Sequence, residues 1–376
     1  MLEAAALQEN RVIMLVDFDY FYAQCEEREN PSLKDKPVVV CMYSGRGEDR
    51  GAISTANYIA RKYGVKSGIP IILAKRKLKD KDAAFLPANF DLYEKVSENI
   101  MSLLKSYADK FEQMGIDEAF LDVTQKTSGS FEKAKQLAET IQREILEKEK
   151  ITLSVGIGPN KLIAKMAAGR QKPFGLTMVK PEEVETFLSP LPVNELVGIG
   201  KKTAKALQEM EIKTVGDLAK FDLEKLIKRF GKVLGVYFYN AANGIDESPV
   251  QERGMIESIS HILTLKEDTK DLGAILQLAH KMGTDVFQRA KELNLNFRTV
   301  TAQLILQDMT THSKSKTFGT TIDSLEVLKE SIRELFEKLL SETPEELKAR
   351  RIGVKISNFS QGGQTQKHIT EYVSKE

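Results

Sequence analysis

The chain has 376 residues with 55 basic and 54 acidic side chains, so its net charge of +1 excludes a strongly basic nucleic-acid binder. Hydrophobic residues make up 41% of the chain, which is typical of a folded protein, and the length predicts two to four compact units. Two cysteines, Cys25 and Cys41, are too few for a disulfide framework or a zinc site and indicate a reducing cytoplasm. No apolar run approaches the ~20 residues of a membrane span, and the start lacks the basic residues of a signal peptide.

The first strong pattern is VIMLVDFDYFY, residues 12–22. Five consecutive apolar residues from Val12 predict a strand that is buried on both faces, and Asp17 stands where this strand leaves the core. Asp19 is placed to cap a helix that we expect over about 20–28. A carboxylate is therefore expected on a rigid strand end, beside a helix N-terminus that favours phosphate.

A second acidic pattern is GIDEAFLDV, residues 115–123, whose apolar neighbours predict a hairpin in a sheet. In a regular strand Asp117 and Glu118 would point to opposite faces, but in a tight turn after Gly115 they can converge. If the strand of Asp17 lies beside this hairpin, three carboxylates meet at one end of one sheet. Such an oxygen-only set predicts two Mg²⁺ ions and phosphoryl transfer.

The rest of the first half predicts an α+β unit. GIG at 156–158 lacks the third glycine of a dinucleotide-binding fingerprint, so that reading is excluded. Strands crossed by helices, with a late hairpin, argue against a doubly wound sheet. The expected strands are 36–42 and 151–157, and the expected helices are 55–63, 91–107, 131–149 and 161–169.

The second half begins with a proline-rich stretch and the segment LVGIGKKT, residues 196–203. Glu195 stands where the phosphate-binding loop of nucleotide hydrolases requires glycine, so that motif is absent. A helix-hairpin-helix, whose glycines offer backbone N–H groups to DNA phosphates, fits better, and an ordinary helix-capping turn is the alternative. Helices continue through 214–242, with breaks at Gly231 and Gly244.

A polar stretch then predicts a linker, followed by a unit in which two helices cover one side of a four-stranded sheet. Arg351 and Lys355 fall on one face of the last strand, whereas Lys314 and Lys316 flank an expected turn. The expected strands are 258–265, 299–306 and 351–357, and the expected helices are 272–293 and 324–340.

The motifs VDFDYFYAQCEE, STANYIARKYGVKSGIP and GIDEAFLD resemble the Y family of DNA polymerases, of the DNA polymerase IV type. The resemblance runs in order from about residue 12 to 358. It implies an α+β multidomain right-hand polymerase with an all-α thumb and a C-terminal α/β little finger. The implied boundaries are palm 1–20 and 87–179, fingers 21–86, thumb 180–245 with the helix-hairpin-helix, linker 246–255, little finger 256–360 and tail 361–376.

The resemblance also implies site residues. Asp17, Asp117 and Glu118 would be catalytic and would hold two Mg²⁺ with the carbonyl of Phe18. The implied nucleotide-binding residues are Tyr20, Phe21, Tyr22, Thr55, Tyr58, Arg61 and Lys172, with Tyr22 as the steric gate against ribonucleotides. The nascent base pair would be roofed by Met42, Ala52, Ser54 and Gly68. DNA contacts would come from Gly198, Gly200, Lys201, Lys314, Lys316, Arg351 and Lys355.

In the tail, Gln366, Ile369 and Tyr372 resemble a sliding-clamp binding box, and chance spacing is the alternative. The implied partners are primer–template DNA, deoxynucleoside triphosphates and a sliding clamp. The resemblance also implies a cytoplasmic monomer that does not bind a membrane. The implied function is low-fidelity translesion DNA synthesis without proofreading, in DNA damage repair. Two other hypotheses are an inactive DNA-binding or clamp-docked scaffold of the same fold and a nucleotide cyclase, which can use a similar palm.

Overall fold

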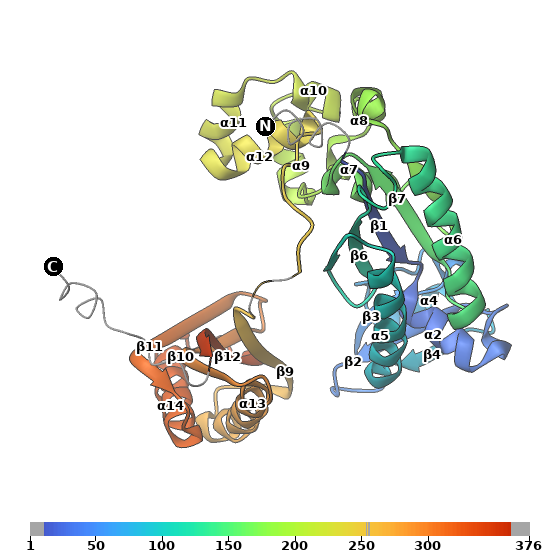
Figure 1. The fold of residues 1–376 in the computed structure, drawn as a ribbon. Coiled ribbons are helices and arrows are strands. Elements are labelled where there is room, and N and C mark those ends of the chain that lie inside the picture. Colours follow the sequence, from blue (N-terminus) through green and yellow to red (C-terminus); the bar gives the residue numbers. More distant parts are fainter. Residues whose placement is uncertain (1–10, 253, 255, 362–376) are drawn as a thin grey trace. The chain divides into compact units, whose positions relative to one another are not determined.

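The computed structural model describes residues 11–252, 254 and 256–361 (Figure 1). These residues fall into two compact units. The first is built from 11–42 and 52–252, and the second from 43–51 and the described residues after 253. None of the helices within these described ranges is long and apolar enough to cross a bilayer.

The first unit contains a five-stranded sheet, which we call the palm sheet, with the order β5-β6-β1-β7-β8. Its first four strands pair antiparallel and β8 runs parallel to β7. The strands are β1 (Ile13–Phe18), β5 (Lys110–Gln113), β6 (Glu118–Asp122), β7 (Leu153–Gly158) and β8 (Leu176–Met178). The strand of Asp17 is therefore central and lies beside the predicted hairpin, β5 and β6, as the sequence indicated.

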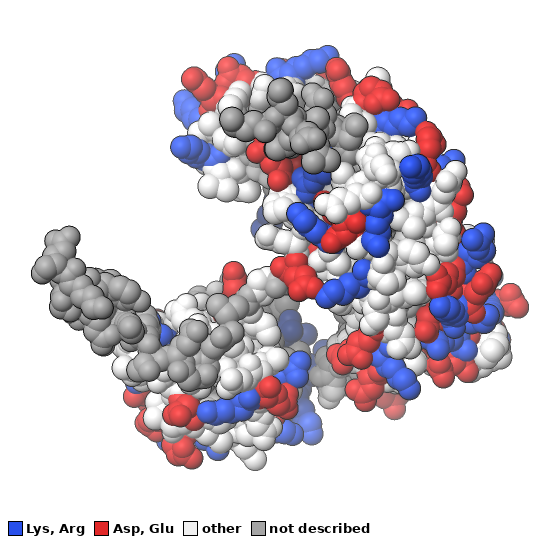
Figure 2. Space-filling view, in the orientation of Figure 1, with Lys and Arg blue, Asp and Glu red and all other residues white. Residues whose placement is uncertain are grey.

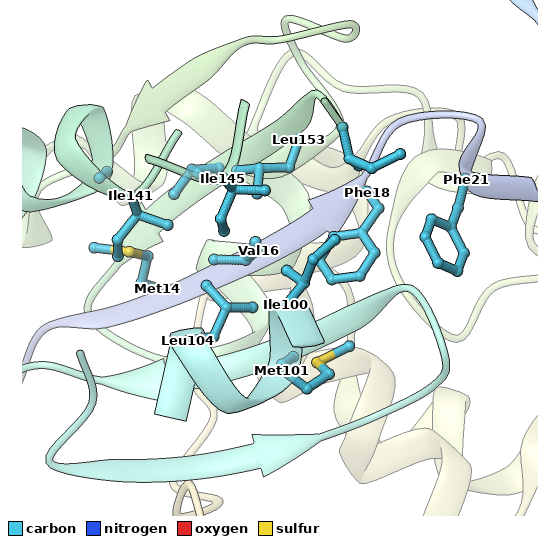
Figure 3. Close-up of a cluster of buried hydrophobic side chains, with 14 of the residues drawn as sticks. Met14, Val16, Phe18, Phe21, Ile100, Met101, Leu104, Ile141, Ile145 and Leu153 are labelled. Carbon is cyan, nitrogen blue, oxygen red and sulfur yellow. The ribbon is translucent and has the colours of Figure 1, made fainter. Parts of the chain in front are cut away.

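Helices cover β1 on both faces. Met14, Val16 and Phe18 pack against the helices α5 (Phe90–Ser106) and α6 (Phe131–Glu149), as Figure 3 shows. Ile13 and Leu15 point to the other face, where they pack with residues of α7 (Lys161–Ala168). The predicted strand buried on both faces is confirmed. Since side chains alternate along a strand, Asp17 lies on the α7 face.

Two glycines of β7 let α7 approach the sheet closely. A Cβ atom on Gly156 would lie 2.0 Å from the carbonyl oxygen of Ala164, and one on Gly158 would lie 2.7 Å from the Ile163 side chain. Because Cβ atoms do not tolerate such distances, only glycine permits this helix position. The GIG segment thus has a packing role, and it brings the side chains of α7 over the end of β1.

The predicted fingers contain a three-stranded sheet of order β3-β2-β4 with short helices. These elements are α2 (Phe21–Glu29), η1 (Pro31–Leu33), β2 (Val38–Tyr43), β3 (Gly51–Ala56), α3 (Tyr58–Lys62), α4 (Ile71–Lys77) and β4 (Ala84–Pro87). The prediction of a helix from residue 55 was wrong, because β3 continues to Ala56. The helix begins only where the Asn57 side chain accepts from the N–H of Ala60.

The predicted capping of α2 by Asp19 was also wrong. The N-cap is Tyr20, in the left-handed region with φ of 35° and without a side-chain cap. Asp19 is instead fully buried, where it accepts from the hydroxyl of Ser154 at 2.7 Å and from the backbone N–H of Phe174 at 2.8 Å. It therefore ties the end of β1 to the loop before β8, a structural role.

The predicted thumb is all-helical, and its core includes Leu162, Ile163 and Met166 of α7. Its helices are η2 (Pro181–Glu183), α8 (Val184–Leu188), η3 (Val193–Glu195), α9 (Lys201–Gln208), α10 (Val215–Ala219), α11 (Leu223–Phe230) and α12 (Lys232–Ala242). Since α7 packs against both the palm sheet and this core, it joins the two parts of the first unit.

The stretch 246–252, predicted as a linker, has no helix or strand but is anchored to the palm. Val250 is 1% exposed and packs with the cluster around Leu15. Asp246 accepts from the N–H of Leu162 at 3.0 Å, and the N–H of Gln251 donates to Glu112 at 3.3 Å. This part of the expected linker is therefore a strap held against the first unit.

The second unit contains a four-stranded antiparallel sheet of order β11-β10-β12-β9, with two helices on one face. Val300, Ala302 and Leu304 of its central strand belong to the core beneath these helices, as predicted. The stretch around Lys314 was expected to be a turn but is strand. The elements are β9 (Ser258–Thr269), α13 (Leu272–Glu292), β10 (Leu295–Leu306), β11 (Thr311–Ile322), α14 (Leu325–Ser341) and β12 (Ala349–Gln361).

Candidate active site

The ends of β1 and β6 bring the predicted carboxylates together. Asp17 and Glu118 are direct partners in the antiparallel register, so their side chains leave the same face of the sheet with Cβ atoms about 5 Å apart. Asp117 precedes Glu118, and its carbonyl accepts from the N–H of Phe18 at 2.8 Å. Residues a hundred positions apart in the chain therefore meet at one strand end.

Negative charge is crowded at this end of the palm sheet. Burial raises the pKa of Asp17, a shift that Lys172 opposes and the charge of Glu118 increases. Burial also raises the pKa of Asp117, and the charges of Asp17 and Glu118 add to it. Two lysines supply the compensation: Lys172 donates to Oδ1 of Asp17, and Lys165 donates to both carboxylate oxygens of Glu118, at 2.7 and 3.0 Å.

The donor set fits a hard divalent cation. Its atoms are all oxygens, the ligands that Mg²⁺ prefers. Burial, and then the neighbouring carboxylates, raise the pKa values of Asp17 and Asp117, and a bound cation would favour the charged forms that burial opposes. Within residues 11–252, 254 and 256–361, no three His, Cys, Asp or Glu side chains converge as a formed metal site. The carboxylates of Asp17 and Glu118 are instead engaged by the two lysines.

Tyr22 lies on the first turn of α2 and is held by other aromatic rings. Its ring stacks on Tyr93, with centroids 4.4 Å apart and an angle of 10° between the planes, and Phe90 packs edge-on at 5.9 Å. Burial raises the pKa of Tyr22, and the charge of Asp117 is the next cause. A rigid ring beside the carboxylates is what a steric gate requires.

Phe21, predicted beside Tyr22 as a nucleotide contact, is buried, and its ring centroid lies 5.8 Å from that of Tyr22. Its side chain is 2% exposed and packs against Phe18, with ring centroids 5.1 Å apart. This side chain therefore belongs to the core of the first unit.

Tyr58 and Arg61 share one side of α3, as the spacing predicted. The Arg61 guanidinium lies 4.8 Å from the centroid of the Tyr58 ring, and Tyr20 packs edge-on against the same ring at 5.2 Å. Burial raises the pKa of Tyr58, and the charges of Asp19 and Asp17 contribute. Tyr58 therefore lies near the acidic strand end, and the Nε of Arg61 donates to the carbonyl of Ala56 at 2.8 Å. The Tyr20 hydroxyl itself is engaged, since it donates to Glu27 at 3.2 Å.

The four residues predicted to roof the base pair lie at neighbouring positions. Ala52 and Ser54 are on β3 beside Thr55, Met42 is on β2 and is 43% exposed, and the N–H of Gly68 donates to the carbonyl of Ile53 at 2.8 Å. Small side chains in this arrangement leave room for a flat group to approach the backbone.

The predicted hairpin of the thumb has two different glycines. Gly198 has φ of 87°, and a Cβ there would lie 2.7 Å from the ring of Tyr237, whose hydroxyl donates to the carbonyl of Val197. Gly200 is the N-cap of α9 without a side-chain cap, and nothing lies within 4 Å of an added Cβ. Gly198 therefore shapes the turn, whereas Gly200 and the exposed Lys201 leave the helix start open to a phosphate.

The free face of the little-finger sheet is rich in hydroxyl groups. The strand register places Arg351 and Lys355 on this face, as predicted, whereas the core residues of β10 lie on the other face of the sheet. Their cross-strand neighbours are mostly Ser and Thr, and none is acidic. The hydroxyl residues of this face are Ser258, Ser260, Thr264, Thr299, Thr301, Thr311, Ser313, Ser315, Thr317 and Ser357.

Lys314 and Lys316 were predicted to bind DNA with Arg351 and Lys355, but the structure does not bring the two pairs together. Their register partners on β10 are core residues, so both lysines point toward the helices. Lys314 pairs with Glu342 at 2.7 Å and Lys316 with Glu334 at 2.7 Å. Basic and acidic side chains are interspersed over the visible surface, as the near-zero net charge implies (Figure 2).

One residue of the site, Lys165, was missed by the sequence reasoning. The available signal was its spacing: it lies one turn after Lys161 on α7 and seven residues before Lys172. The predicted clamp-binding residues Gln366, Ile369 and Tyr372 lie outside the described residues.

Comparison with known proteins agrees with this geometry. Residues 16–169 match the model of the impB/mucB/samB family, and residues 256–369 match that of its C-terminal domain. Residues 194–246 match a DNA polymerase-iota thumb domain. The chain is 46% identical to the DNA polymerase IV of Nitrosopumilus maritimus over 97% of this chain and 100% of that protein. It is 48% identical to the DNA polymerase IV of Methanosarcina acetivorans over 94% and 98%.

Solved structures agree as well. A Y-family DNA polymerase chimera is 40% identical, with a TM-score of 0.88 over 93% of this chain and 100% of the chimera. An insertion ternary complex of Dbh DNA polymerase is 39% identical, with a TM-score of 0.67 over 93% and 100%. Because relatives at this identity span nearly the whole chain, the chain belongs to the Y family of DNA polymerases.

Proposed function

We propose that Asp17, Asp117 and Glu118 are the catalytic carboxylates with which this chain extends a primer on a DNA template. The chain is a translesion DNA polymerase, as its similarity to proteins named DNA polymerase IV and to Y-family complexes indicates. The observation that carries the site assignment is the register that sets Asp17 opposite Glu118, with Asp117 beside them.

The carboxylates would hold two Mg²⁺ ions, whose chemistry is to lower the pKa of the primer 3′-hydroxyl and to stabilise charge on the phosphate oxygens. Asp17, Asp117, Glu118 and the Phe18 carbonyl would hold these ions, with Glu118 closest to the primer hydroxyl and the Phe18 carbonyl on the side of the nucleotide. The rigid strand end keeps these oxygens in place before substrate arrives, which reduces the reorganisation that the reaction requires.

The triphosphate would be bound by Lys172, Arg61, Tyr58 and Thr55. Lys172 already lies at the acidic strand end, where it donates to Asp17, and a triphosphate would offer it more oxygens. Tyr58 of α3 lies near the same region, and Arg61 lies against its ring. Tyr22 would exclude the 2′-hydroxyl of a ribonucleotide, and Met42, Ala52, Ser54 and Gly68 would contact the base pair.

DNA would be held mostly through its backbone. In the thumb, the open N-terminus of α9 at Gly200 and Lys201 offers N–H groups and one charge to a phosphate. In the little finger, Arg351 and Lys355 lie among hydroxyl groups that can donate to phosphates. The charges of Lys314 and Lys316 are partly satisfied by α14, so we expect weaker contacts from them.

Low fidelity, lesion bypass without proofreading and docking to a sliding clamp complete the proposal. Deletion of residues 366–376 should abolish clamp-stimulated synthesis and spare basal synthesis. Equal stimulation of the truncated chain would remove the clamp-binding box from the account.

A primer–template extension assay with Mg²⁺ tests the site assignment. The Asp117→Ala/Glu118→Ala protein should lose at least about a thousandfold in rate, because a charge clamp that acts in the transition state is removed. The variant should keep wild-type affinity for DNA within a few fold. Extension by the variant at a wild-type rate would show that these carboxylates are not catalytic. A wild-type chain that binds DNA without extending it would favour the scaffold.

A further inference from the structure

Helix α7 carries two lysines one turn apart, and each faces a glutamate of the palm sheet. Lys161 donates to both oxygens of Glu112 on β5, at 2.7 and 2.9 Å, and Lys165 donates to both oxygens of Glu118 on β6. Register places Glu112 opposite Phe120, which lies two residues after Glu118, so both glutamates leave the face that α7 covers. The two ion pairs are therefore matched in geometry.

Their surroundings differ. Glu112 also accepts from the N–H of Gln251, Lys161 also donates to the carbonyl of Pro249, and their side chains are only 12% and 16% exposed. This pair fastens the strap to the palm. The side chains of Glu118 and Lys165 are 22% and 35% exposed. Among the hydrogen bonds of the described residues, the ammonium of Lys165 donates to Glu118 alone.

We propose that Lys165 is a counter-ion that occupies the carboxylate of Glu118 before a divalent cation binds, and that it competes with the cation for those oxygens. This inference rests on the proposed function of Asp17, Asp117 and Glu118. The ammonium holds both oxygens of Glu118, so a cation that binds Glu118 draws at least one oxygen away from Lys165. The close packing of α7 on Gly156 fixes the position of this helix. Helix α7 therefore cannot move away from the sheet and carry Lys165 away from Glu118.

The role predicts an effect with a distinctive sign. Removing the charge of Lys165 removes a competitor and a repulsive charge, so the cation should bind more tightly. A lysine that only supported the fold, or only oriented Glu118 for the cation, would give unchanged or weaker binding when removed. The charge of the side chain, rather than its shape, is therefore the property to test.

The test measures binding of Mn²⁺ to the full chain without DNA or nucleotide, from the electron paramagnetic resonance signal of free Mn²⁺. Lys165→Met should lower the Kd roughly three- to tenfold, near and just above the upper end of what exposed ion pairs contribute. Lys165→Gln repeats the test with a shorter neutral side chain. Lys165→Arg keeps the charge and should bind Mn²⁺ like wild type. Lys161→Met removes the matched lysine, which lies outside the cation site, and should change the Kd less than twofold.

The outcomes separate this inference from the proposed function. If Asp117→Ala/Glu118→Ala abolishes Mn²⁺ binding but both neutral variants of Lys165 bind as weakly as wild type or more weakly, the competing role is overturned and the cation site stands. If wild type binds no Mn²⁺, or the double variant binds it as wild type does, the cation site itself is wrong and the inference falls with it.

Discussion

The palm sheet and the little-finger sheet use their faces in different ways. Strand β1 of the palm is covered by helices on both faces, so its charge appears only at the strand end, at Asp17. The little-finger sheet is covered on one face, and its free face spreads hydroxyl groups and two cations over four strands. Closing both faces concentrates charge where a cation is needed, whereas an open face distributes weak contacts. Single substitutions should therefore have large effects at the palm and small effects on the little finger.

The largest effect we expect outside the carboxylates is at Tyr22. Tyr22→Ala removes the ring that Tyr93 and Phe90 hold in place, so a ribose 2′-hydroxyl would no longer be excluded. Discrimination against ribonucleotides, measured as the ratio of kcat/KM values, should fall on the order of a hundredfold. Tyr22→Phe keeps the ring and should discriminate like wild type. Unchanged sugar selection by Tyr22→Ala would remove the gate from this residue.

A second prediction concerns the closed face of the palm. Gly156→Ala would place a Cβ 2.0 Å from the carbonyl oxygen of Ala164, so α7 must shift. Urea unfolding should show a loss of about 1–3 kcal/mol in the free energy of unfolding, the usual range for overpacking. Gly169→Ala is the control, since its nearest contact would be 3.6 Å away. A loss no larger than that of the control would mean that the tight fit of α7 is not required.

The acidic strand end and the packing of α7 show which parts of the site could be predicted from the sequence. The apolar run from Val12 and the acidic hairpin predicted the strand, its burial and the three carboxylates, because each depends on a local pattern and on one pairing. The partners of those carboxylates could not be predicted. Lys165 reaches Glu118 only because Gly156 and Gly158 bring α7 onto the sheet, a contact without a periodic signal. The prediction for Lys316 was wrong because a turn was expected where β11 runs. Without a strand and its register, the face on which this side chain lies could not be predicted.

On the little finger, the open face should give a smaller effect. Arg351→Ala/Lys355→Ala removes two cations, so DNA affinity should fall several fold, and the slope of log Kd against log salt should decrease by about 2. Lys314→Ala/Lys316→Ala is the matched comparison and should change the slope less, since both lysines point to α14. Fluorescence anisotropy with primer–template DNA at several salt concentrations measures both. A larger loss from the second pair would reverse the assignment of the faces.

The smallest effect we predict is on stability and its pH dependence. The pKa of Asp117 is raised above its ordinary value of 3.8, so the folded state keeps this proton to higher pH than the unfolded chain does. The stability that it contributes is complete below pH 3.8 and is lost as pH rises through the raised pKa. Without divalent cations, Asp117→Asn should therefore be more stable than wild type at pH 7. In urea unfolding, the difference should shrink on acidification. A difference that grows toward low pH would contradict the burial of Asp117 among other carboxylates at this strand end.

The central claim is that Asp17, Asp117 and Glu118 hold the catalytic cations together. The most direct measurement is a crystal structure of the full chain with primer–template DNA, a non-hydrolysable nucleotide and Mn²⁺, whose anomalous scattering locates the ions. The account predicts anomalous peaks in contact with all three carboxylates. It also predicts that Glu118 no longer forms both of its hydrogen bonds with Lys165. Peaks bound elsewhere, with Glu118 still paired to Lys165 and no ion on Asp17, would contradict it.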